Sequence, residues 1–456
     1  MNQESSGRWQ RLNEHLTALM SRTQVPGVAL GLLHDGAIQT AGFGVTSVEN
    51  PLPVTGETLF QIGSITKTFV GTAVMRLVER DQIDLDATVR TYLPHFRVRD
   101  PDASARATIR HLLTHIGGWA GDLFRDTGAG DDALARYVAD MAELPQLAPL
   151  NTHWSYNNAG FSLLGRILEV VTGQTCEQAI RDLVLDPLDM AHAFFEPAQV
   201  MTHRFAVGHQ VGADGPAVAR PWPLARAAHP AGGLTCSVLD LMQYACVHAG
   251  QDTDANRQPL LSAESLAAMQ SPQATVWRDK AAWGLAWGIE EVDGARVVAH
   301  GGGTNGQISL LALVPAHRFA LALLTNANRG SALIRQVREW VLAEYLGLEV
   351  RSPEPLETPA GELAPYAGVY RGYFTDLELG VLGGRLVGQV TYKRGFPDQD
   401  APVQPPPPPA ALALCEEDRL LILDGPAKDG LVDVIRQPDG AIGWLRFSGR
   451  LHTRQP

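Results

Sequence analysis

The sequence is poor in lysine, in cysteine and in long apolar segments. Of its 37 basic residues 33 are arginines, and the lysines are only Lys67, Lys280, Lys393 and Lys428. The four cysteines show neither the spacing of a zinc site nor the density of a disulfide framework. No apolar segment is long enough to span a bilayer, and the N-terminal segment lacks the apolar core of a signal peptide. We therefore expect a cytoplasmic protein with free thiols and no membrane partner.

The acidic excess of the sequence limits the classes of partner. With 49 acidic and 37 basic residues the net charge is −12, and no basic cluster offsets it. Such a chain lacks the electrostatic footprint of a nucleic-acid-binding protein. At 456 residues, 45% of them hydrophobic, it can bury a large core and is expected to form two domains. A small molecule or a short peptide is the expected substrate, and the sequence leaves a homo-oligomer open.

One of the few lysines belongs to a pattern that carries chemistry. Lys67 follows Ser64 by three residues, and apolar residues recur at helical spacing from position 65 onward. Ser64 is therefore expected in the first turn of a helix or at its cap, where unpaired N–H groups favour developing negative charge. The three-residue step places the Lys67 amine beside the Ser64 hydroxyl, as activation of a nucleophile requires. The alternative is that Ser64 only caps the helix and Lys67 is solvated.

Two further segments extend this pattern along the chain. The run Trp-Ser-Tyr-Asn-Asn-Ala-Gly occupies 154–160 before a predicted helix, and three glycines follow His300 after a short apolar strand at 297–299. Ser-x-x-Lys, then Tyr-x-Asn, then a basic residue with glycines resembles the serine β-lactamase and penicillin-binding-protein superfamily, specifically its class C-like branch of esterases and D-peptidases. The resemblance spans about residues 10–347 and includes landmarks at 110–115, 230–234 and 283–288.

The resemblance implies a role for each matching residue. Ser64 would be the acylated nucleophile, Lys67 its proton acceptor or electrostatic partner, and Tyr156 a base whose phenol is acidified by Lys67. Asn158 would hydrogen-bond the substrate amide and the lysine, and the backbone N–H groups of Ser64 and Gly303 would form the oxyanion hole. The alternative makes Tyr156 a half-buried aromatic residue and Asn158 a helix cap.

Departures from the family pattern affect the expected substrate. β-Lactamases and penicillin-binding proteins usually carry a lysine at the position of His300, and that lysine meets a substrate carboxylate. Histidine is mostly neutral at neutral pH and binds a carboxylate less strongly. His300, Gly302 and Gly303 are thus predicted to bind substrate, but efficient turnover of β-lactam drugs is not expected; the alternative for His300 is an exposed strand-end residue. The loop at 115–118 is His-Ile-Gly-Gly where relatives commonly carry His-Thr-Ser-Gly, which affects the polarity expected beside the site.

Competing motifs fail in their context. The residues at 301–306 satisfy a dinucleotide-binding pattern, but 307–314 alternate like a strand instead of opening a helix. His111 and His115 stand four apart on an apparent helix, yet no glutamate or cysteine pair accompanies them as zinc ligands. No lysine follows a glycine as in a Walker A loop, and no Gly-x-Ser-x-Gly elbow occurs. We therefore expect neither a metal nor another cofactor.

The predicted elements describe an α/β fold of the α+β kind. One antiparallel sheet flanked by helices is expected from a hairpin at 28–33 and 37–45, strands near 297, at 308–314 and at 319–325, and a helix at 333–346. Helices at 133–141 and 161–171 indicate an all-helical region beside the sheet, with the site in the cleft. Residues 191–230 show little periodicity and are expected to frame the pocket. Residues 1–350 would thus form a β-lactamase/transpeptidase-like domain.

The composition changes after residue 350. Residues 351–363 are polar and proline-rich, as in a linker, and in 364–456 apolar runs alternate with the turn pairs Gly383-Gly384, Asp424-Gly425 and Asp439-Gly440. This pattern predicts a small antiparallel β domain. Its opening, Tyr-Ala-Gly-Val-Tyr at 366–370, resembles that of the lipocalin-like barrel appended to some peptidases and esterases of the family. Capping of the cleft or self-association is the hypothesis for this domain.

Together, these observations predict a serine hydrolase that forms an acyl-enzyme at Ser64. Its expected substrates are small esters, or amides and peptides with D-residues. β-Lactam hydrolysis and transacylation are alternatives with the same mechanism. A protein that binds acyl or peptidoglycan-like ligands without turnover is the alternative of another class.

Overall fold

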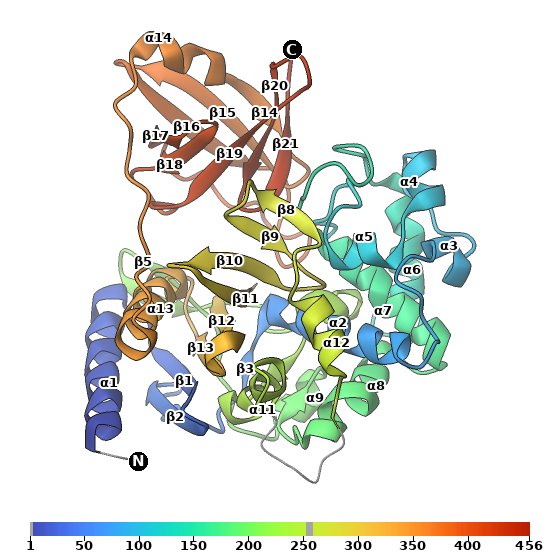
Figure 1. Ribbon diagram of the computed structural model, residues 1–456, viewed down its shortest axis with the longest axis vertical. Helices are drawn as coiled ribbons and strands as arrows, with labels where there is room; N and C mark the ends of the chain where they lie inside the picture. The colour runs from blue at the N-terminus through green and yellow to red at the C-terminus, as the bar shows by residue number, and fades with distance from the viewer. Residues whose placement is uncertain (1–2, 252–258) are drawn as a thin grey trace. The chain divides into compact units, whose positions relative to one another are not determined.

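The computed structural model describes residues 3–251 and 259–456 (Figure 1). The chain divides into two compact units. The first unit comprises Met1–Ala87, Thr127–Leu134 and Phe161–Val350, and the second comprises Thr88–Asp126, Ala135–Gly160 and Arg351–Pro456. Both units therefore combine segments that are distant in the sequence. The predicted domain boundaries at residues 350 and 364 stay a prediction.

An antiparallel sheet of eight strands, counted over the described residues, forms the centre of the first unit. Its strands lie in the order β2-β1-β13-β12-β11-β10-β9-β8. In that order they span Ala37–Gly44, Gly27–His34, Phe319–Thr325, Gln307–Val314, Ala295–Thr304, Gly288–Val292, Ala281–Trp283 and Ala274–Trp277. Asp35 and Gly36 both have positive φ, as a two-residue turn between β1 and β2 requires. The predicted antiparallel sheet is confirmed.

Helices pack against both faces of this sheet. α1 (Gln3–Thr23) and α13 (Gly330–Leu346) lie side by side (Figure 1) and share one core with strand β1, which includes Leu12, Leu16, Leu30, Leu32, Val337 and Val341. α11 (Val238–His248) packs on β1 from the other side. There Gly31 makes room for α11, because a Cβ on Gly31 would lie 2.6 Å from Met242 Cγ. Alternate residues of β1 thus face opposite helix layers.

Shorter elements complete the first unit. Its remaining helices are α2 (Thr66–Val78), α7 (Asn158–Thr172, with its first three residues in the second unit), α8 (Cys176–Ile180), α9 (Pro197–Val200), α10 (His229–Gly232) and α12 (Ala263–Met269). A small sheet has the order β3-β7-β4, with strands Phe60–Gln61, Thr235–Cys236 and Ala193–Phe194. A hairpin joins β5 (His209–Gly212) and β6 (Gly215–Val218). The segment 191–230, which shows little periodicity, is therefore built from short elements.

The second unit contains a closed antiparallel barrel and several short helices. Eight strands, β14 to β21, close the barrel in sequence order, and all of them lie within the described residues. They span Gly368–Arg371, Thr375–Leu382, Arg385–Tyr392, Ala410–Glu416, Arg419–Ile422, Leu431–Arg436, Ile442–Phe447 and Arg450–Arg454. The helices are α3 (Val89–Tyr92), α4 (Pro101–Arg106), α5 (Ile109–Leu113), α6 (Ala133–Asp140, with its first two residues in the first unit) and α14 (Ala360–Leu363). The predicted antiparallel β region is confirmed.

Two predicted element boundaries are wrong. The strand expected to end before His300 continues as β11 to Thr304, because the glycines pair in register with β12, Gly302 opposite Ser309. α5 ends at Leu113, so His115 lies beyond the helix. His115 has a positive φ of 59°, and it therefore shares no helix face with His111.

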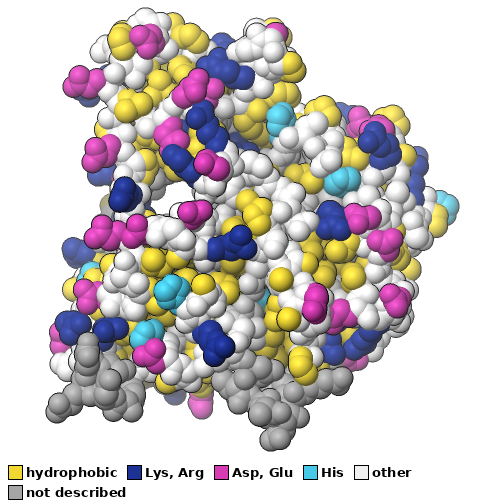
Figure 2. Space-filling view, in the orientation of Figure 1, with side chains coloured by type: hydrophobic (Ala, Val, Ile, Leu, Met, Phe, Trp, Pro, Cys, Tyr) yellow, Lys and Arg dark blue, Asp and Glu magenta, His cyan; other side chains and the backbone are white. Residues whose placement is uncertain are grey.

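The charged surface and the helices bear on the expected partners. Acidic and basic side chains are interspersed over the visible face in Figure 2. Among the described helices none has the length and apolar character needed to cross a bilayer. The cytoplasmic location stays a prediction.

Candidate active site

Ser64 lies in a tight turn that leads into helix α2. The 3-10 turn Gly63–Ile65 precedes Thr66, where α2 begins. Gly63 has a φ of +53°, a conformation that a residue with a Cβ adopts only with strain. The Thr66 hydroxyl donates to the Gly63 carbonyl over 2.7 Å and accepts from the Leu234 N–H over 3.1 Å. The predicted position of Ser64 at the start of a helix is confirmed.

Strand β11 approaches this turn backbone to backbone. A Cβ on Gly63 would lie 2.5 Å from the Gly303 nitrogen, and a Cβ on Gly302 would lie 2.9 Å from the Ile62 carbonyl carbon. The Ser309 hydroxyl, from the neighbouring strand β12, donates to the Ile62 carbonyl over 2.7 Å. The two glycines therefore let strand β11 touch the turn at 62–65, and the structure brings Gly302 and Gly303 next to the turn that contains Ser64.

Lys67 is fully buried and points at Ser64. Its Nζ lies 3.0 Å from the Ser64 Oγ and also donates to the Ala231 carbonyl. The Phe161 ring packs 5.5 Å from the same nitrogen. The alternative that Lys67 is a solvated side chain is wrong. A lysine amine at this distance can exchange a proton with the serine hydroxyl.

A partly buried ion-pair cluster supports the backbone that accepts the hydrogen bond of Lys67. Ala231 belongs to the short helix α10, and the His229 Nδ1 at its start donates to a Glu177 carboxylate oxygen over 2.8 Å. The Arg226 Nε donates to the same oxygen over 3.3 Å. Burial alone would raise the pKa of Glu177, but the hydrogen bond and charge of His229, together with Arg226, lower it to about 2. Glu177 is therefore a carboxylate across the working pH range and holds α10 in place.

His300 is a buried, neutral histidine within strand β11. It is 4% exposed, and its Nδ1 donates to the Gly301 carbonyl over 2.6 Å. The Trp283 ring meets it edge-on at 5.4 Å. Burial, and then the charge of Lys67, lower the pKa of His300 to about 3. The alternative of an exposed histidine is wrong, and His300 carries no charge for a substrate carboxylate at neutral pH.

Tyr156 and Asn158 lie in the second unit, at the start of α7. The His115 ring centroid lies 4.4 Å from that of Tyr156, and its Nδ1 accepts from the Asn157 N–H over 3.1 Å. Asn157, which sequence reasoning passed over, caps the helix by accepting from the Gly160 N–H over 2.8 Å. Asn158 instead donates from Nδ2 to Asp122 over 2.7 Å. The alternative of Asn158 as the helix cap is wrong.

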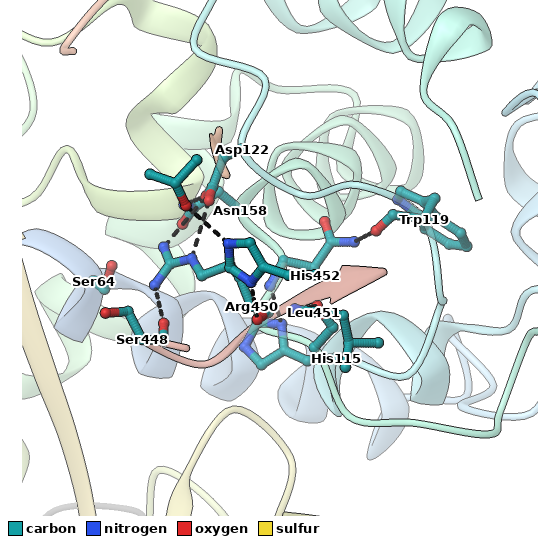
Figure 3. Close-up of polar contacts among 12 residues, drawn as sticks. Ser64, His115, Trp119, Asp122, Asn158, Ser448, Arg450, Leu451 and His452 are labelled. Atoms are coloured by element: carbon teal, nitrogen blue, oxygen red, sulfur yellow. Dashed lines mark hydrogen bonds and ion pairs between the residues drawn. The ribbon is translucent and has the colours of Figure 1, made fainter. Parts of the chain in front are cut away.

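Two further residues that sequence reasoning missed contact this segment (Figure 3). Arg450, on barrel strand β21, donates from Nε to Asp122 over 3.0 Å. Its guanidinium carbon lies 4.7 Å from the centre of the Tyr156 ring. Asp122 accepts from both Arg450 and Asn158, and only 6% of its side chain is exposed. No local pattern marks these residues, because Arg450 and Asp122 are 328 positions apart.

A cavity of about 560 Å³ lies in the second unit, largely inside the barrel. Its wall is mainly apolar and aromatic. The lining includes Leu377, Leu379, Val390, Leu412, Ile422, Val432 and Phe447 from the strands, together with Tyr156, Asp122 and Arg450. An apolar group of a ligand therefore has a pocket beside Tyr156.

The predicted site residues thus fall into two groups. One group belongs to the first unit and lies on the turn before α2, on α2 or on β11: Ser64, Lys67, His300, Gly302 and Gly303. The other group, Tyr156 and Asn158, belongs to the second unit. That the two groups form one site stays a prediction.

An antiparallel sheet between helix layers, with a serine–lysine pair at the start of a helix against a glycine-bearing strand, is the arrangement of the β-lactamase-type serine hydrolases. The chain belongs to the β-lactamase family: residues 12–343 match the family model described as Beta-lactamase.

Curated relatives include a penicillin-binding protein and an esterase. The chain is 35% identical over 373 residues to "Penicillin-binding protein 4" of Amycolatopsis lactamdurans, covering 79% of this chain and 96% of that protein. It is 34% identical over 213 residues to "Esterase EstB" of Burkholderia gladioli, covering 44% of this chain and 54% of that protein. The predicted membership in the penicillin-binding-protein and esterase group is confirmed.

Solved structures show the same architecture. A crystal structure of SurE with D-Leu covers 99% of this chain and 100% of that chain, with a TM-score of 0.78 and 25% sequence identity. A class C β-lactamase from Rhodobacter sphaeroides covers 73% of this chain and 99% of that chain, with a TM-score of 0.60 and 23% identity. The predicted class C-like fold is thereby confirmed.

Proposed function

We propose that this protein is a serine hydrolase that forms an acyl-enzyme at Ser64 with small esters or short peptides. One observation carries the proposal: the buried Lys67 amine lies 3.0 Å from the Ser64 hydroxyl, in a turn that strand β11 holds backbone to backbone. A solvated lysine would not be held in this position, and a structural lysine has no need of a serine partner.

The chemical step needs no cofactor. The Ser64 oxygen attacks the acyl carbonyl while its proton passes to Lys67 or to the Tyr156 phenolate, and the carbonyl oxygen becomes an oxyanion held by the N–H groups of Ser64 and Gly303. Collapse of the intermediate expels the alcohol or amine, which takes that proton. Water then attacks the acyl carbonyl and gives a proton to the Tyr156 phenolate. The bond between the Ser64 oxygen and the acyl carbon breaks, the serine oxygen takes that proton back, and the acid leaves. Asn158, His300 and Gly302 would orient the substrate.

The neutral His300 and the apolar cavity favour an uncharged, apolar acyl donor. With a pKa of about 3, His300 cannot supply the cation with which related enzymes hold a substrate carboxylate. The cavity beside Tyr156 offers space for an apolar side chain. That SurE has been solved with D-Leu, and that an esterase is among the relatives, supports esters and D-residue peptides over β-lactam drugs. A homo-oligomer stays open.

A comparison of three chromogenic substrates tests this proposal. We would assay a short p-nitrophenyl ester, a D-leucyl anilide and a cephalosporin with the wild type, with Ser64→Ala and with Ser352→Ala, a matched exposed serine in the 351–359 segment. Hydrolysis of the ester or the anilide that is lost only in Ser64→Ala is expected. Fast cephalosporin turnover would instead favour the β-lactamase alternative. Unchanged activity in Ser64→Ala would remove the serine mechanism.

A further inference from the structure

The hairpin between barrel strands β20 and β21 holds the Tyr156 segment. Ser448 and Gly449, with φ of 48° and 77°, form its two-residue turn. The Gly449 carbonyl accepts from the Tyr156 N–H over 2.8 Å. Two residues further on, the Leu451 N–H donates to the Ser155 hydroxyl over 3.2 Å. The barrel is therefore joined to the tyrosine segment on both sides of residue 450.

Arg450, between these two contacts, connects Tyr156 to Asp122. Its guanidinium carbon lies 4.7 Å from the Tyr156 ring centre, a cation–π distance. The guanidinium also pairs with Asp122 at 3.0 Å and 3.3 Å (Figure 3). Asp122 also accepts a hydrogen bond from the Asn158 Nδ2 over 2.7 Å. One arginine from the barrel thus touches, directly or through Asp122, both proposed site residues of this unit.

We propose that Arg450 is a positioning residue for Tyr156 and Asn158, so that the barrel orients the proposed site residues of its own unit. The inference rests on the proposed function, because it concerns the base and the substrate-binding amide of that reaction. It assigns the barrel a part in the chemistry, beyond the capping or self-association that its place in the sequence suggests.

The charges around Tyr156 give this role a measurable consequence. Within the described part of the second unit, the titratable groups against the ring are Arg450 from β21, Asp122 behind it, and His115, whose Nδ1 accepts a hydrogen bond and whose proton therefore lies on Nε2. Burial alone would lower the pKa of Arg450, but Asp122 and the charge of Tyr156 raise it. The same charge interaction acts on Tyr156: the Arg450 cation favours the Tyr156 phenolate, and the Asp122 carboxylate opposes it.

Removing each charge should therefore move the pH profile in opposite directions. Without the cation in Arg450→Met, the Tyr156 phenolate forms at higher pH, and the acidic limb of the kcat/KM profile moves to higher pH by about one unit. This value is at the low end of the pKa shifts that a neighbouring charge causes, because 36% of the Arg450 side chain is exposed. In Asp122→Asn the arginine is no longer balanced, and the limb falls. Arg450→Lys keeps the charge and should stay closer to the wild type than Arg450→Met does.

Arg454 provides a matched control on the same strand. Its guanidinium carbon lies 5.7 Å from the Tyr370 ring centre, and the guanidinium donates to the Pro365 and Ala367 carbonyls. Arg454→Met thus removes an arginine over a tyrosine ring from β21 without touching Tyr156. Its pH limb should be that of the wild type even if the variant unfolds at a lower temperature.

The experiment combines the pH profile of ester hydrolysis with titration of the tyrosinate absorbance, taken as a difference from Tyr156→Phe. Opposite shifts in Arg450→Met and Asp122→Asn, with none in Arg454→Met, support the inference. Reduced activity with unmoved limbs overturns it, since a purely structural contact behaves in that way. If Arg450→Met fails to fold, the shift in Asp122→Asn decides alone. Absence of a Ser64 acyl adduct in the wild type would overturn the proposed function and this inference together, whereas unmoved limbs with an intact adduct overturn only the inference.

Discussion

Replacing Gly302 by alanine adds a single methyl group where strand β11 touches the nucleophile turn. The new Cβ would lie 2.9 Å from the Ile62 carbonyl carbon and nearer still to its oxygen. Carbon atoms pack at about 3.5–4.0 Å, so the Ile62 carbonyl has to retreat by roughly 1 Å. Ile62 is two residues before Ser64, and the displacement is therefore passed to the nucleophile.

The expected loss is larger in activity than in stability. Overpacking of this kind costs about 1–3 kcal/mol of folding free energy. A displacement of roughly 1 Å at a reacting group costs on the order of 100-fold in rate. We therefore expect Gly302→Ala to fold with a lowered Tm and to lose about two orders of magnitude in the rate of Ser64 acylation.

Gly301→Ala, one residue earlier in β11, is the matched control. A Cβ on Gly301 meets nothing nearer than the Ser309 carbonyl oxygen at 3.7 Å, an ordinary contact. The assay is the burst of p-nitrophenol from an activated ester under single-turnover conditions, together with thermal unfolding of both variants. If Gly302→Ala acylates as fast as Gly301→Ala, the backbone contact does not position Ser64 and the reasoning is refuted.

Three other substitutions test separate parts of the account. The pKa of His300 is about 3 in the folded protein against an ordinary 6.5, so the unfolded chain binds more protons between these two pH values. The contribution of His300 to stability is therefore complete above about pH 6.5 and is lost toward pH 3. His300→Gln should show a shallower fall of Tm on acidification than the wild type. The pKa of Glu177 is about 2 against an ordinary 4.5, so its contribution to stability is complete above about pH 4.5. Glu177→Gln should lower the free energy of unfolding at neutral pH by roughly 1–3 kcal/mol and slow acylation. Unchanged acylation would mean that α10 holds the Ala231 carbonyl without Glu177. Val390→Trp fills the barrel cavity and should reduce kcat/KM for bulky apolar esters by about tenfold, without reducing kcat/KM for acetyl esters. Val369→Trp, at a barrel residue that is 38% exposed, should reduce kcat/KM for neither class of ester. Equal effects of the two substitutions would contradict the pocket assignment.

Local patterns predicted the nucleophile turn well. Ser64 lies in the 3-10 turn that leads into α2 and Lys67 lies in the first turn of α2, so a three-residue step of helical backbone brings them into contact. The strands β1, β12 and β13 are apolar runs bounded by clear turn residues, and the sequence therefore predicts that they share one antiparallel sheet. The turn at Gly383-Gly384 likewise joins β15 to β16 as predicted.

The predicted ends of one strand and one helix differ from the structure, the strand because its glycines allow close packing. The glycines after His300 have low strand propensity and predict the end of a strand, yet they continue β11 because β12 and the turn at Ile62 lie against them. The sequence predicts one helix through His111 and His115, but α5 ends at Leu113 and the chain turns at His115 through a positive φ.

Contacts between distant segments were beyond sequence reasoning. Arg450 and Asp122 become neighbours of Tyr156 only once the barrel has closed and its last hairpin has met the 155–158 segment. Neither residue stands in a motif, and an arginine on a strand is ordinarily a solvated side chain. The cavity could not be predicted either, because its wall combines residues from seven of the barrel strands with others from 121–156.

The most direct test of the central claim is the mass of the protein after incubation with a p-nitrophenyl ester whose acyl group leaves the enzyme slowly. The account predicts one added acyl group, mapped to the peptide that contains Ser64, and no adduct in Ser64→Ala. It also predicts that Lys67→Met, which removes the amine 3.0 Å from the serine oxygen, acylates far more slowly although Ser64 is intact. An acyl group on any other residue, or full labelling of Lys67→Met, would contradict the account.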